Sequence, residues 1–380
     1  MRVYLDHNAT TPVRAEVLAA MQEAFARAWG NPSSVHAEGA AARALVDRAR
    51  EAVAGLLGAE SGDLVFTAGA TESNNQVLQA LRHRGGPPGS VVSSAAEHPS
   101  VEAPLEALEA AGWRVVRVPV DAEGLLDPDA VEAALAPDTA LVTLLWGHNE
   151  TGVVQPLEAI APRVRARGIP LHVDATQCVG KLAIDLRRLP VDLLSLSAHK
   201  LGGPKGVGAL VARGGAAPAP LLLGGPQERR RRGGTENVAG IAGLGAACAL
   251  AARELPERMA SAAALRDRLW AGIAEKVPRV RRNGSCTRVL CNTLNVELEG
   301  ASGEVLVQAL DLEGVAVSTG AACASGSLHP SSVLAAMGRS PEAARGSLRF
   351  SVGHGNDEAG IDRVLALLPD LVARAREAAA

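Results

Sequence analysis

Aromatic side chains are scarce in this sequence. Its 380 residues include four Trp, three Phe and one Tyr, about 2% of the chain. A core built around aromatic rings is therefore excluded. Because 47% of the residues are still hydrophobic, the core must come from Leu, Val, Ala and Ile. The length is enough for one large domain and a smaller one.

A strong excess of charge is also missing. The net charge of −3 gives no reason to expect nucleic acid or an anionic membrane as a partner. The run RRRR at 229–232 is interpreted as a solvated loop. The N-terminal stretch MRVYLDHNATTPV lacks the features of a signal peptide, and no apolar run has the length of a membrane span. We therefore expect a cytoplasmic protein.

Cysteines are few, and their number is odd. Five cysteines in a long chain argue against a framework of disulfide bonds. Cys286 and Cys291 lie near each other, but no second Cys or His pair accompanies them. We therefore expect no metal site that belongs to the chain itself.

Short apolar runs alternate with helical patterns along the first 200 residues. Helical spacing is found at 13–28, 37–58, 72–83 and 100–111. The apolar runs lie at 63–69, 90–98, 113–120, 140–150, 169–177 and 191–200. Runs such as LVTLLW do not alternate strictly, which is typical of strands buried on both faces of a sheet. The order predicts an α/β fold with a mainly parallel sheet.

The pattern changes in the last third of the chain. It predicts a helix over 256–275, short strands near 288–298 and 315–318, and a final helix over 356–378. We place a domain change near residue 257.

Nearly every predicted strand leads into polar residues. The stretches in question are TAGATESNN, AEHPS, GHNETG, VDATQ and SAHK. In parallel sheets the ligand site lies at the carboxyl ends of the strands. These polar ends therefore predict one shared site.

Two of these strand ends suggest that the site binds an anionic group and a cationic group. Thr71 follows Gly69 at the predicted start of a helix, where free backbone N–H groups bind anions; a plain N-cap is the alternative. Asp174 ends an apolar strand, where a carboxylate needs a cationic partner such as a protonated ring nitrogen; a turn-forming Asp is the alternative.

Lys200 decides between these interpretations. A buried lysine is rare, and its desolvated amine can form a Schiff base. His98 ends another strand and could stack on a flat ring, although most single histidines are structural. An anion-binding helix, a carboxylate, a stacking ring and an imine-forming lysine together describe a site for pyridoxal 5'-phosphate.

The sequence also resembles a known family over nearly its whole length. The motifs that carry the resemblance are YLDHNATTP, GNPSSVHAEG, FTAGATESNN, EHPSV, NETGVVQP, HVDATQCVGK, SLSAHKLGGPKGVGAL, RRRRGGTENVAG, STGAACASGSLHPS and LRFSVG. In this order they are similar to the motifs of the cysteine desulfurases, which are fold-type I, class V aminotransferase-like enzymes.

The resemblance implies a domain organisation. A large domain over 14–257 would hold a mainly parallel seven-stranded sheet and the cofactor. A smaller α+β domain would combine 1–13 with 258–380 and would carry a loop at 318–331.

The resemblance also implies roles for the matching residues. Lys200 would hold pyridoxal phosphate as a Schiff base, Asp174 would pair with the pyridine nitrogen, and Gln177 would reach the ring hydroxyl. The other cofactor contacts would be Ala70, Thr71, His98, Asn149, Ser197, His199 and, from the second subunit of a homodimer, Thr235. The substrate would lie near Asn8, Ala9, Asn31 and Arg349, of which Arg349 would clamp its carboxylate.

Cys323 would be the nucleophile, with Lys200 and His98 as the other catalytic residues. Its surroundings, STGAACASGSLHPS, are rich in Gly, Ala and Ser, which is typical of a mobile loop. By resemblance, Cys323 would take the sulfur of L-cysteine as a persulfide and leave L-alanine.

The length of this loop implies the sulfur acceptor. The chain runs 25 residues from Cys323 to LRFS, which resembles the long-loop branch that serves iron–sulfur cluster assembly through a scaffold protein. Sulfur carriers for tRNA thiolation would be further acceptors. Cys323 would at most share a cluster transiently with the scaffold.

Two alternatives stay open at this point. Another class V enzyme, such as a selenocysteine lyase or a small-amino-acid aminotransferase, would share the cofactor pocket. A cofactor-bearing assembly platform without turnover is the second, and the presence of Lys200, Asp174, Cys323 and Arg349 argues against it.

Overall fold

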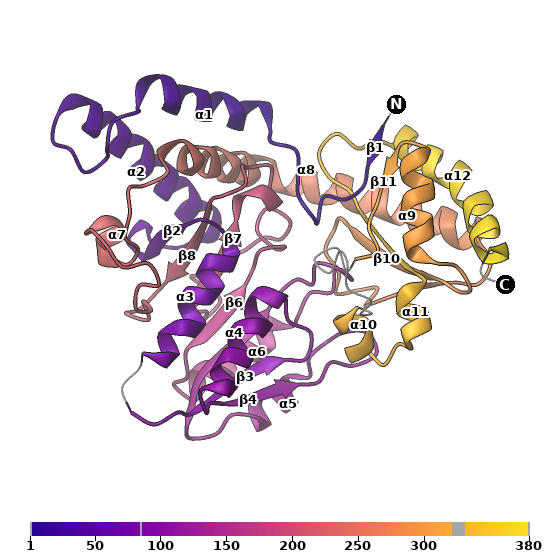
Figure 1. Ribbon diagram of the computed structural model, residues 1–380, viewed down its shortest axis with the longest axis horizontal. Helices are drawn as coiled ribbons and strands as arrows, with labels where there is room; N and C mark the ends of the chain where they lie inside the picture. Colours follow the sequence, from indigo (N-terminus) through magenta and orange to yellow (C-terminus); the bar gives the residue numbers. More distant parts are fainter. Residues whose placement is uncertain (1, 84–85, 321–330, 379–380) are drawn as a thin grey trace.

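The architecture centres on one large sheet. The computed structural model describes residues 2–83, 86–320 and 331–378 (Figure 1). Seven strands form the sheet in the order β2-β8-β7-β6-β5-β3-β4. Their bounds are Leu64–Thr67 (β2), Ser90–Ser94 (β3), Arg114–Val118 (β4), Thr139–Leu145 (β5), Leu171–Asp174 (β6), Leu193–Ser197 (β7) and Gly208–Ala212 (β8). β8 runs antiparallel to both neighbours and the other pairs are parallel, which confirms the predicted fold class.

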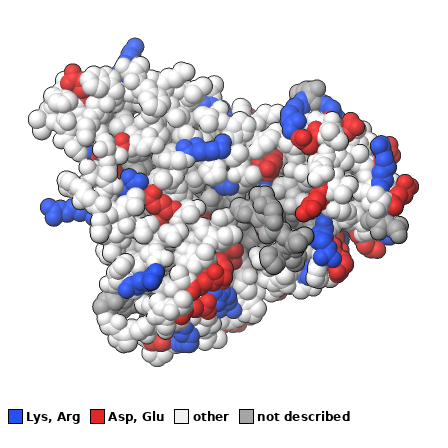
Figure 2. Space-filling model, in the orientation of Figure 1, with Lys and Arg blue, Asp and Glu red and all other residues white. Residues whose placement is uncertain are grey.

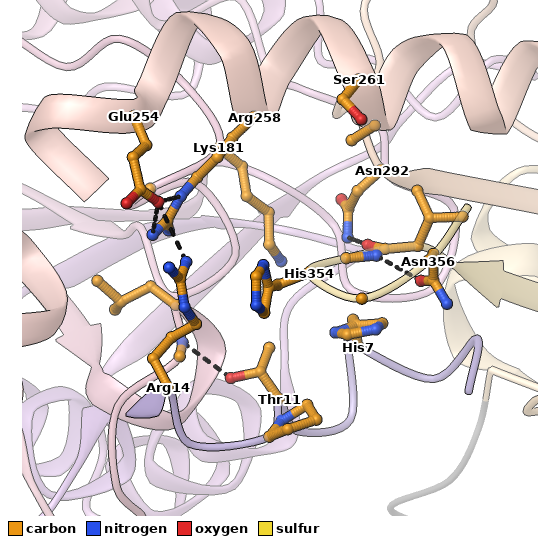
Figure 3. Close-up of a pocket in the computed structure, with 18 of the residues that line it drawn as sticks. His7, Thr11, Arg14, Lys181, Glu254, Arg258, Ser261, Asn292, His354 and Asn356 are labelled. Atoms are coloured by element: carbon orange, nitrogen blue, oxygen red, sulfur yellow. Dashed lines mark hydrogen bonds and ion pairs between the residues drawn. The ribbon is translucent and has the colours of Figure 1, made fainter. Parts of the chain in front are cut away.

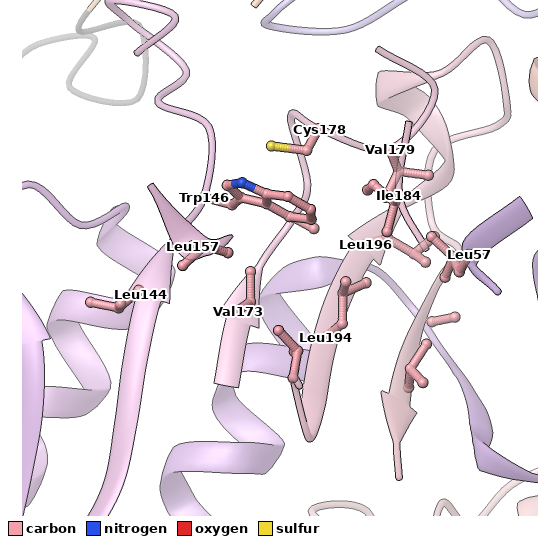
Figure 4. Close-up of a cluster of buried hydrophobic side chains, with 14 of the residues drawn as sticks. Leu57, Leu144, Trp146, Leu157, Val173, Cys178, Val179, Ile184, Leu194 and Leu196 are labelled. Carbon is pink, nitrogen blue, oxygen red and sulfur yellow. The ribbon is translucent and has the colours of Figure 1, made fainter. Parts of the chain in front are cut away.

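Helices cover both faces of this sheet. They are α1 (Ala15–Arg27), α2 (Ala37–Leu57), α3 (Ala70–Arg82), α4 (Pro99–Ala110), α5 (Pro128–Ala133), α6 (Leu157–Ala166) and α8 (Val238–Lys276). Val91 and Leu193 pack with α3 and α4, whereas the next residues, Val92 and Leu194, belong to the larger cluster with α2, α6 and α8. Figure 4 shows part of that larger cluster. Because both faces are buried, the sequences of the central strands are continuous apolar runs.

The rest of the chain forms a second, smaller unit with its own hydrophobic cluster. β9 (Val280–Arg282), β10 (Thr293–Leu298) and β12 (Ser347–Ser351) are antiparallel, and β1 (Val3–Tyr4) pairs in parallel with β11 (Val315–Ala316). The helices here are α9 (Gly303–Leu312), α10 (Ser332–Ala336), α11 (Pro341–Arg345) and α12 (Glu358–Glu377). The separate cluster and the return of β1 support the proposed division into 14–257 and the two outer segments.

Helix α8 joins the two units and is longer than predicted. We expected a helix from 256, but α8 spans 39 residues from Val238 and continues through Pro256. Its first part is rich in Gly and Ala, which are needed for close packing: a Cβ added at Gly245 would lie 2.5 Å from the Cα of Ala49 in α2. Tertiary packing therefore overrides the low helix propensity of glycine.

By length and composition α8 could also cross a membrane, contrary to our reading of the sequence. However, 61% of its most apolar window is buried inside the fold. It packs against α1 and α2, so we interpret it as a core helix.

A buried ion pair fastens the segment before α8. Arg50 of α2 donates two hydrogen bonds to Glu228, at 3.0 and 2.6 Å, and Glu228 also accepts from the backbone N–H of Phe66. Glu228 lies in α7 (Gln227–Arg230), at the start of the four arginines. Arg231 and Arg232 are half-buried and bond to the β2 region and to Glu72, so this segment is only partly the solvated loop that we expected.

We predict that Arg50→Met lowers the free energy of unfolding by about 3–5 kcal/mol, because it leaves the Glu228 carboxylate buried without its cation. Urea unfolding followed by circular dichroism measures this loss. Arg114→Met, which breaks the exposed pair with Asp138, is the matched control and should cost less than about 1 kcal/mol. Equal losses in the two variants would contradict the prediction.

Candidate active site

The predicted site residues meet in one cavity of about 570 Å³ at the carboxyl ends of the central strands. Those that line it are Asn8, Ala9, Ala70, Thr71, His98, Asn149, Asp174, Gln177, Ser197, His199, Lys200 and Arg349. They come from seven separate stretches of the sequence and from both units of the fold. The polar strand ends therefore do form one shared site.

Lys200 lies directly after β7, at the end of a short 3₁₀ turn, Ala198–Lys200. Its Nζ donates to the backbone oxygens of Asn8 and Ala9 at 2.6 and 2.8 Å. The strand thus delivers the amine into the cavity, where the N-terminal segment of the chain holds it.

Asp174 ends β6 and is only 2% exposed. Asn74 Nδ2 donates to its Oδ2 at 2.8 Å, and the backbone N–H of Thr176 donates to its Oδ1 at 3.0 Å. Within the described parts of the chain, Asp174 forms no ion pair with a Lys, Arg or His side chain. A buried carboxylate held only by neutral donors favours a cationic ligand in the cavity.

The start of α3 offers a site for an anion. Gly69 is the N-cap residue and makes no side-chain cap, so the first-turn N–H groups at Ala70 and Thr71 have no intrahelical acceptor. A Cβ at Gly69 would lie 3.6 Å from Ser197 Oγ, and its φ of 155° suits glycine. Backbone N–H groups and the Ser197 hydroxyl can therefore approach a phosphate closely.

His98 fits both interpretations made from the sequence, a structural histidine and a ring that could stack on a flat ligand. Its Nδ1 accepts from the backbone N–H of Ser100 at 3.1 Å and thereby caps α4, while the ring lines the cavity. Burial lowers the pKa of His98, although Asp174 acts in the opposite direction. The ring is therefore a neutral group that can stack and accept a proton.

His199 is held at the anion end of the cavity. Its Nδ1 lies 3.1 Å from Thr10 Oγ1. Burial first, and then nearby Lys200 and Lys205, lower the pKa of His199 to about 4. Its ring is neutral at pH 7, with one nitrogen available to donate.

Arg349 of β12 is 2% exposed and also lines the cavity. Its guanidinium pairs with Asp6 Oδ1 at 2.6 Å and donates to the backbone oxygens of Asn149 and Gly320 at 3.0 and 3.4 Å. Among the described residues, its buried Nε has no hydrogen-bond partner. This fixed fork with one open N–H fits a substrate carboxylate.

A single chain does not bring all the predicted residues together. Asn31 and Thr235 are exposed and do not line the cavity. Cys323 lies outside the described residues. The roles assigned to these three stay predictions, as do the roles of the residues that line the cavity.

Sequence reasoning missed several residues of the site. Asp6 orients Arg349, and Lys181 donates to Gln177 from behind the cavity. Glu97 is buried beside His98 and accepts from Ser94 Oγ and the backbone N–H of Leu145. Asp6 pairs with Arg349 from 343 positions away, and Glu97 accepts from Leu145 48 positions away. Only the YLDH and VGK motifs could have directed attention to Asp6 and Lys181.

The comparisons with known proteins agree with this geometry. Residues 3–364 match the family described as Aminotransferase class-V. The chain is 45% identical to a cysteine desulfurase of Gluconacetobacter diazotrophicus, over 99% of this chain and 94% of that protein. It is 42% identical to "Cysteine desulfurase IscS" of Methanosarcina thermophila, over 98% of this chain and 93% of that protein.

Solved structures point the same way. One titled "NIFS-LIKE PROTEIN" has a TM-score of 0.92 and 34% identity, over 98% of this chain and 100% of that one. A second, "SspA in complex with cysteine", has a TM-score of 0.83 and 35% identity, over 93% and 99%. The fold and site thus define a class V pyridoxal-phosphate enzyme. Within that class, the chain belongs to the cysteine desulfurase family.

Enzymes of this family depend on pyridoxal phosphate, held by a lysine as a Schiff base. The residues present fit that group. The buried Asp174 carboxylate suits its ring nitrogen, the start of α3 suits its phosphate, and Lys200 Nζ lies on the wall of the same cavity.

Glu97 generates a prediction about pH. Burial first, and then the charge of Asp174, raise the pKa of Glu97 to about 8. Between its ordinary pKa and pH 8 the folded chain keeps a proton that the unfolded chain releases, so stability falls as the pH rises. The limiting slope is about 1.4 kcal/mol per pH unit.

We predict that Glu97→Gln removes this decline of stability with rising pH. The urea midpoint of the variant should exceed that of the parent by a margin that grows from pH 5 to pH 8. Glu106→Gln, on the exposed side of α4, is the control and should follow the parent. A constant margin across this range would show that Glu97 is already ionised.

Proposed function

We propose that this chain converts L-cysteine into L-alanine and holds the released sulfur on Cys323 as a persulfide. The observation that carries the proposal is that Lys200 and Arg349 line the same cavity from opposite units of the fold. An amine for the cofactor and a guanidinium for an amino-acid carboxylate thereby line one space. The match to cysteine desulfurases supports cysteine as that amino acid.

The cofactor would be held by Lys200, by Asp174 at its ring nitrogen, by Gln177 at its ring oxygen and by His98 against its face. Ala70, Thr71, Ser197 and His199 would hold its phosphate, with Asn149 beside the ring. When bound, pyridoxal phosphate supplies an electron sink for the substrate's α carbon. The protein supplies position and proton transfer.

Lys200 would move the α proton of the substrate through Nζ once that amine is free. His98 would assist, because its neutral ring can accept a proton. Arg349 would fix the substrate carboxylate, with Asp6 holding the guanidinium in orientation. Asn8 would keep Lys200 in place through its backbone oxygen.

Cys323 would attack as a thiolate. Its sulfur forms a bond to the sulfur of the substrate, the substrate carbon–sulfur bond breaks, and the electron pair left on carbon takes up a proton to complete alanine. Gly320 lines the cavity, and three residues span at most about 11 Å. This span from Gly320 supports the role proposed for Cys323.

The sulfur would pass to an iron–sulfur scaffold protein, and further to sulfur carriers for tRNA thiolation. The relative named IscS and the NifS-like structure support the first of these acceptors. So does the length of the segment from Cys323 to Leu348. We place these reactions in the cytoplasm.

A homodimer would complete the site, with Thr235 reaching the cofactor phosphate of the second subunit. Phe25 and Trp29 are 69% and 71% exposed at the end of α1, and Val35 follows them fully exposed. Figure 2 shows few charged side chains over this region, whereas both signs gather over α9, α11 and α12. An apolar, weakly charged face is typical of a surface that a partner covers.

The first test is the reaction itself. The purified holoenzyme, given L-cysteine and a reductant, should release alanine and sulfide in equal amounts. Cys323→Ser should lower the rate on the order of 10³-fold while the visible absorbance of the cofactor stays. Cys286→Ser, at an exposed cysteine outside the cavity, is the control and should be unchanged. Alanine formation at the parent rate in Cys323→Ser would overturn the nucleophile assignment.

The second test concerns the dimer. The double variant Phe25→Ser/Trp29→Ser should raise the Kd of dimerisation roughly 10-fold or more, because exposed aromatic residues carry much of the energy of an interface. Sedimentation velocity over a concentration series measures this. Leu312→Ser, at an equally exposed apolar residue of α9, is the control. If the double variant and this control sediment alike, the interface lies elsewhere.

A further inference from the structure

A second lysine lies buried directly behind the cofactor cavity. Lys181 is 8% exposed and follows β6 in the turn after Asp174. Its Nζ donates to Gln177 Oε1 at 2.7 Å and to Asn8 Oδ1 at 3.3 Å. In the described ranges no carboxylate forms an ion pair with it. Both of its partners are therefore neutral amide oxygens.

Lys181 lines a second cavity of about 570 Å³, on the other side of Lys200. Figure 3 shows the end of its side chain pointing toward His354, with Asn292 and His7 lining the same cavity. Lys200 lines both cavities. The amine of Lys181 is thus behind the cofactor site, and its hydrogen bonds to Asn8 and Gln177 connect it to that site.

Burying the charged amine of Lys181 costs free energy of desolvation. Desolvation first, and then the charge of Lys200, lower the pKa of Lys181 to about 7. The charged or titratable groups that interact with it are His7, Cys178, His199, Lys200, Cys291 and Arg349. An apolar side chain of similar length would avoid the cost of desolvation. The free energy of folding gives no reason for a lysine at this position. Its hydrogen bonds to Asn8 and Gln177 instead point to a role in the site.

The hydrogen bonds show what that role is. Lys181 Nζ donates to Gln177 Oε1, and in its protonated form it cannot accept, so it requires Gln177 to present its oxygen. The Nε2 of Gln177 is then directed to the opposite side, where it donates to the backbone oxygen of Asn8 at 2.9 Å. Lys200 Nζ donates to that same oxygen. The direction of the Gln177 amide therefore decides which atom faces Lys200 and the cofactor ring.

We propose that Lys181 is a positioning residue that fixes the side-chain amide of Gln177, so that its N–H donors and not its oxygen face the ring oxygen of the cofactor. The inference rests on the cofactor placement of the proposed function. Without Lys181, the two orientations of the amide are no longer distinguished. An amide oxygen turned toward the ring oxygen would repel it.

The pH at which the visible absorbance of the bound cofactor changes tests this. That midpoint reports the proton on the Lys200 nitrogen. A ring oxygen that loses its donor becomes more negative and retains the proton to higher pH. Lys181→Met should therefore raise the midpoint by about one pH unit, an effect typical of a lost hydrogen bond to a charged group.

Lys181→Arg is the conservative variant, because it restores a donor-only cation and the second cavity has room for the guanidinium. Its midpoint should return to within about 0.3 units of the parent. Thermal unfolding of each variant is recorded alongside. A purely structural lysine would lower the melting temperature in Lys181→Met and leave the midpoint unchanged, which would overturn the proposal.

A double-mutant cycle separates positioning from the charge of Lys181 itself. In the Gln177→Ala background, the shift caused by Lys181→Met should fall to less than half of its value in the parent. A shift of full size there would mean that Lys181 acts through its charge alone. Loss of alanine and sulfide formation in the parent would instead refute the proposed function, and it would leave these spectral shifts as they are.

Discussion

Asn8 connects the two units of the fold and Lys200 through its own hydrogen bonds. Its side chain donates to the backbone of Asn149 and to Thr293, and accepts from Asn292 and Lys181. Its backbone oxygen accepts from Lys200 and Gln177. The segment that carries it runs from β1 in the smaller unit to α1 against the larger one. The position of the Lys200 amine therefore depends on both units being assembled.

Much of the site could be predicted because its residues follow directly from the strands. A parallel sheet buried on both faces has few places for polar side chains other than its strand ends. Asp174 and Lys200 end β6 and follow β7, and Thr71 opens the helix after β2. For these residues, local sequence and fold class together were enough to predict a common location.

The remaining features depend on contacts between distant segments. Asp6 and Arg349 are 343 positions apart, and nothing in the pattern around either predicts their ion pair. Glu97 follows an ordinary strand end, and its pKa is raised by burial and by the charge of Asp174, which lies 77 positions away. The start of α8 was missed for a similar reason: its glycines favour a helix only because α2 packs closely against them.

Helix α8 has a mechanical consequence for the molecule. At 1.5 Å per residue its 39 residues reach about 58 Å, with one end in each hydrophobic core. A straight helix of this length couples a rotation of one core to a rotation of the other, unless the helix bends. Pro256 lacks a backbone N–H, so the helix is weakest near the middle. Glu254, Glu257 and Arg258 flank that point and line the cavity behind Lys200. Any bending of this helix is therefore concentrated beside the cavity that Lys200 lines.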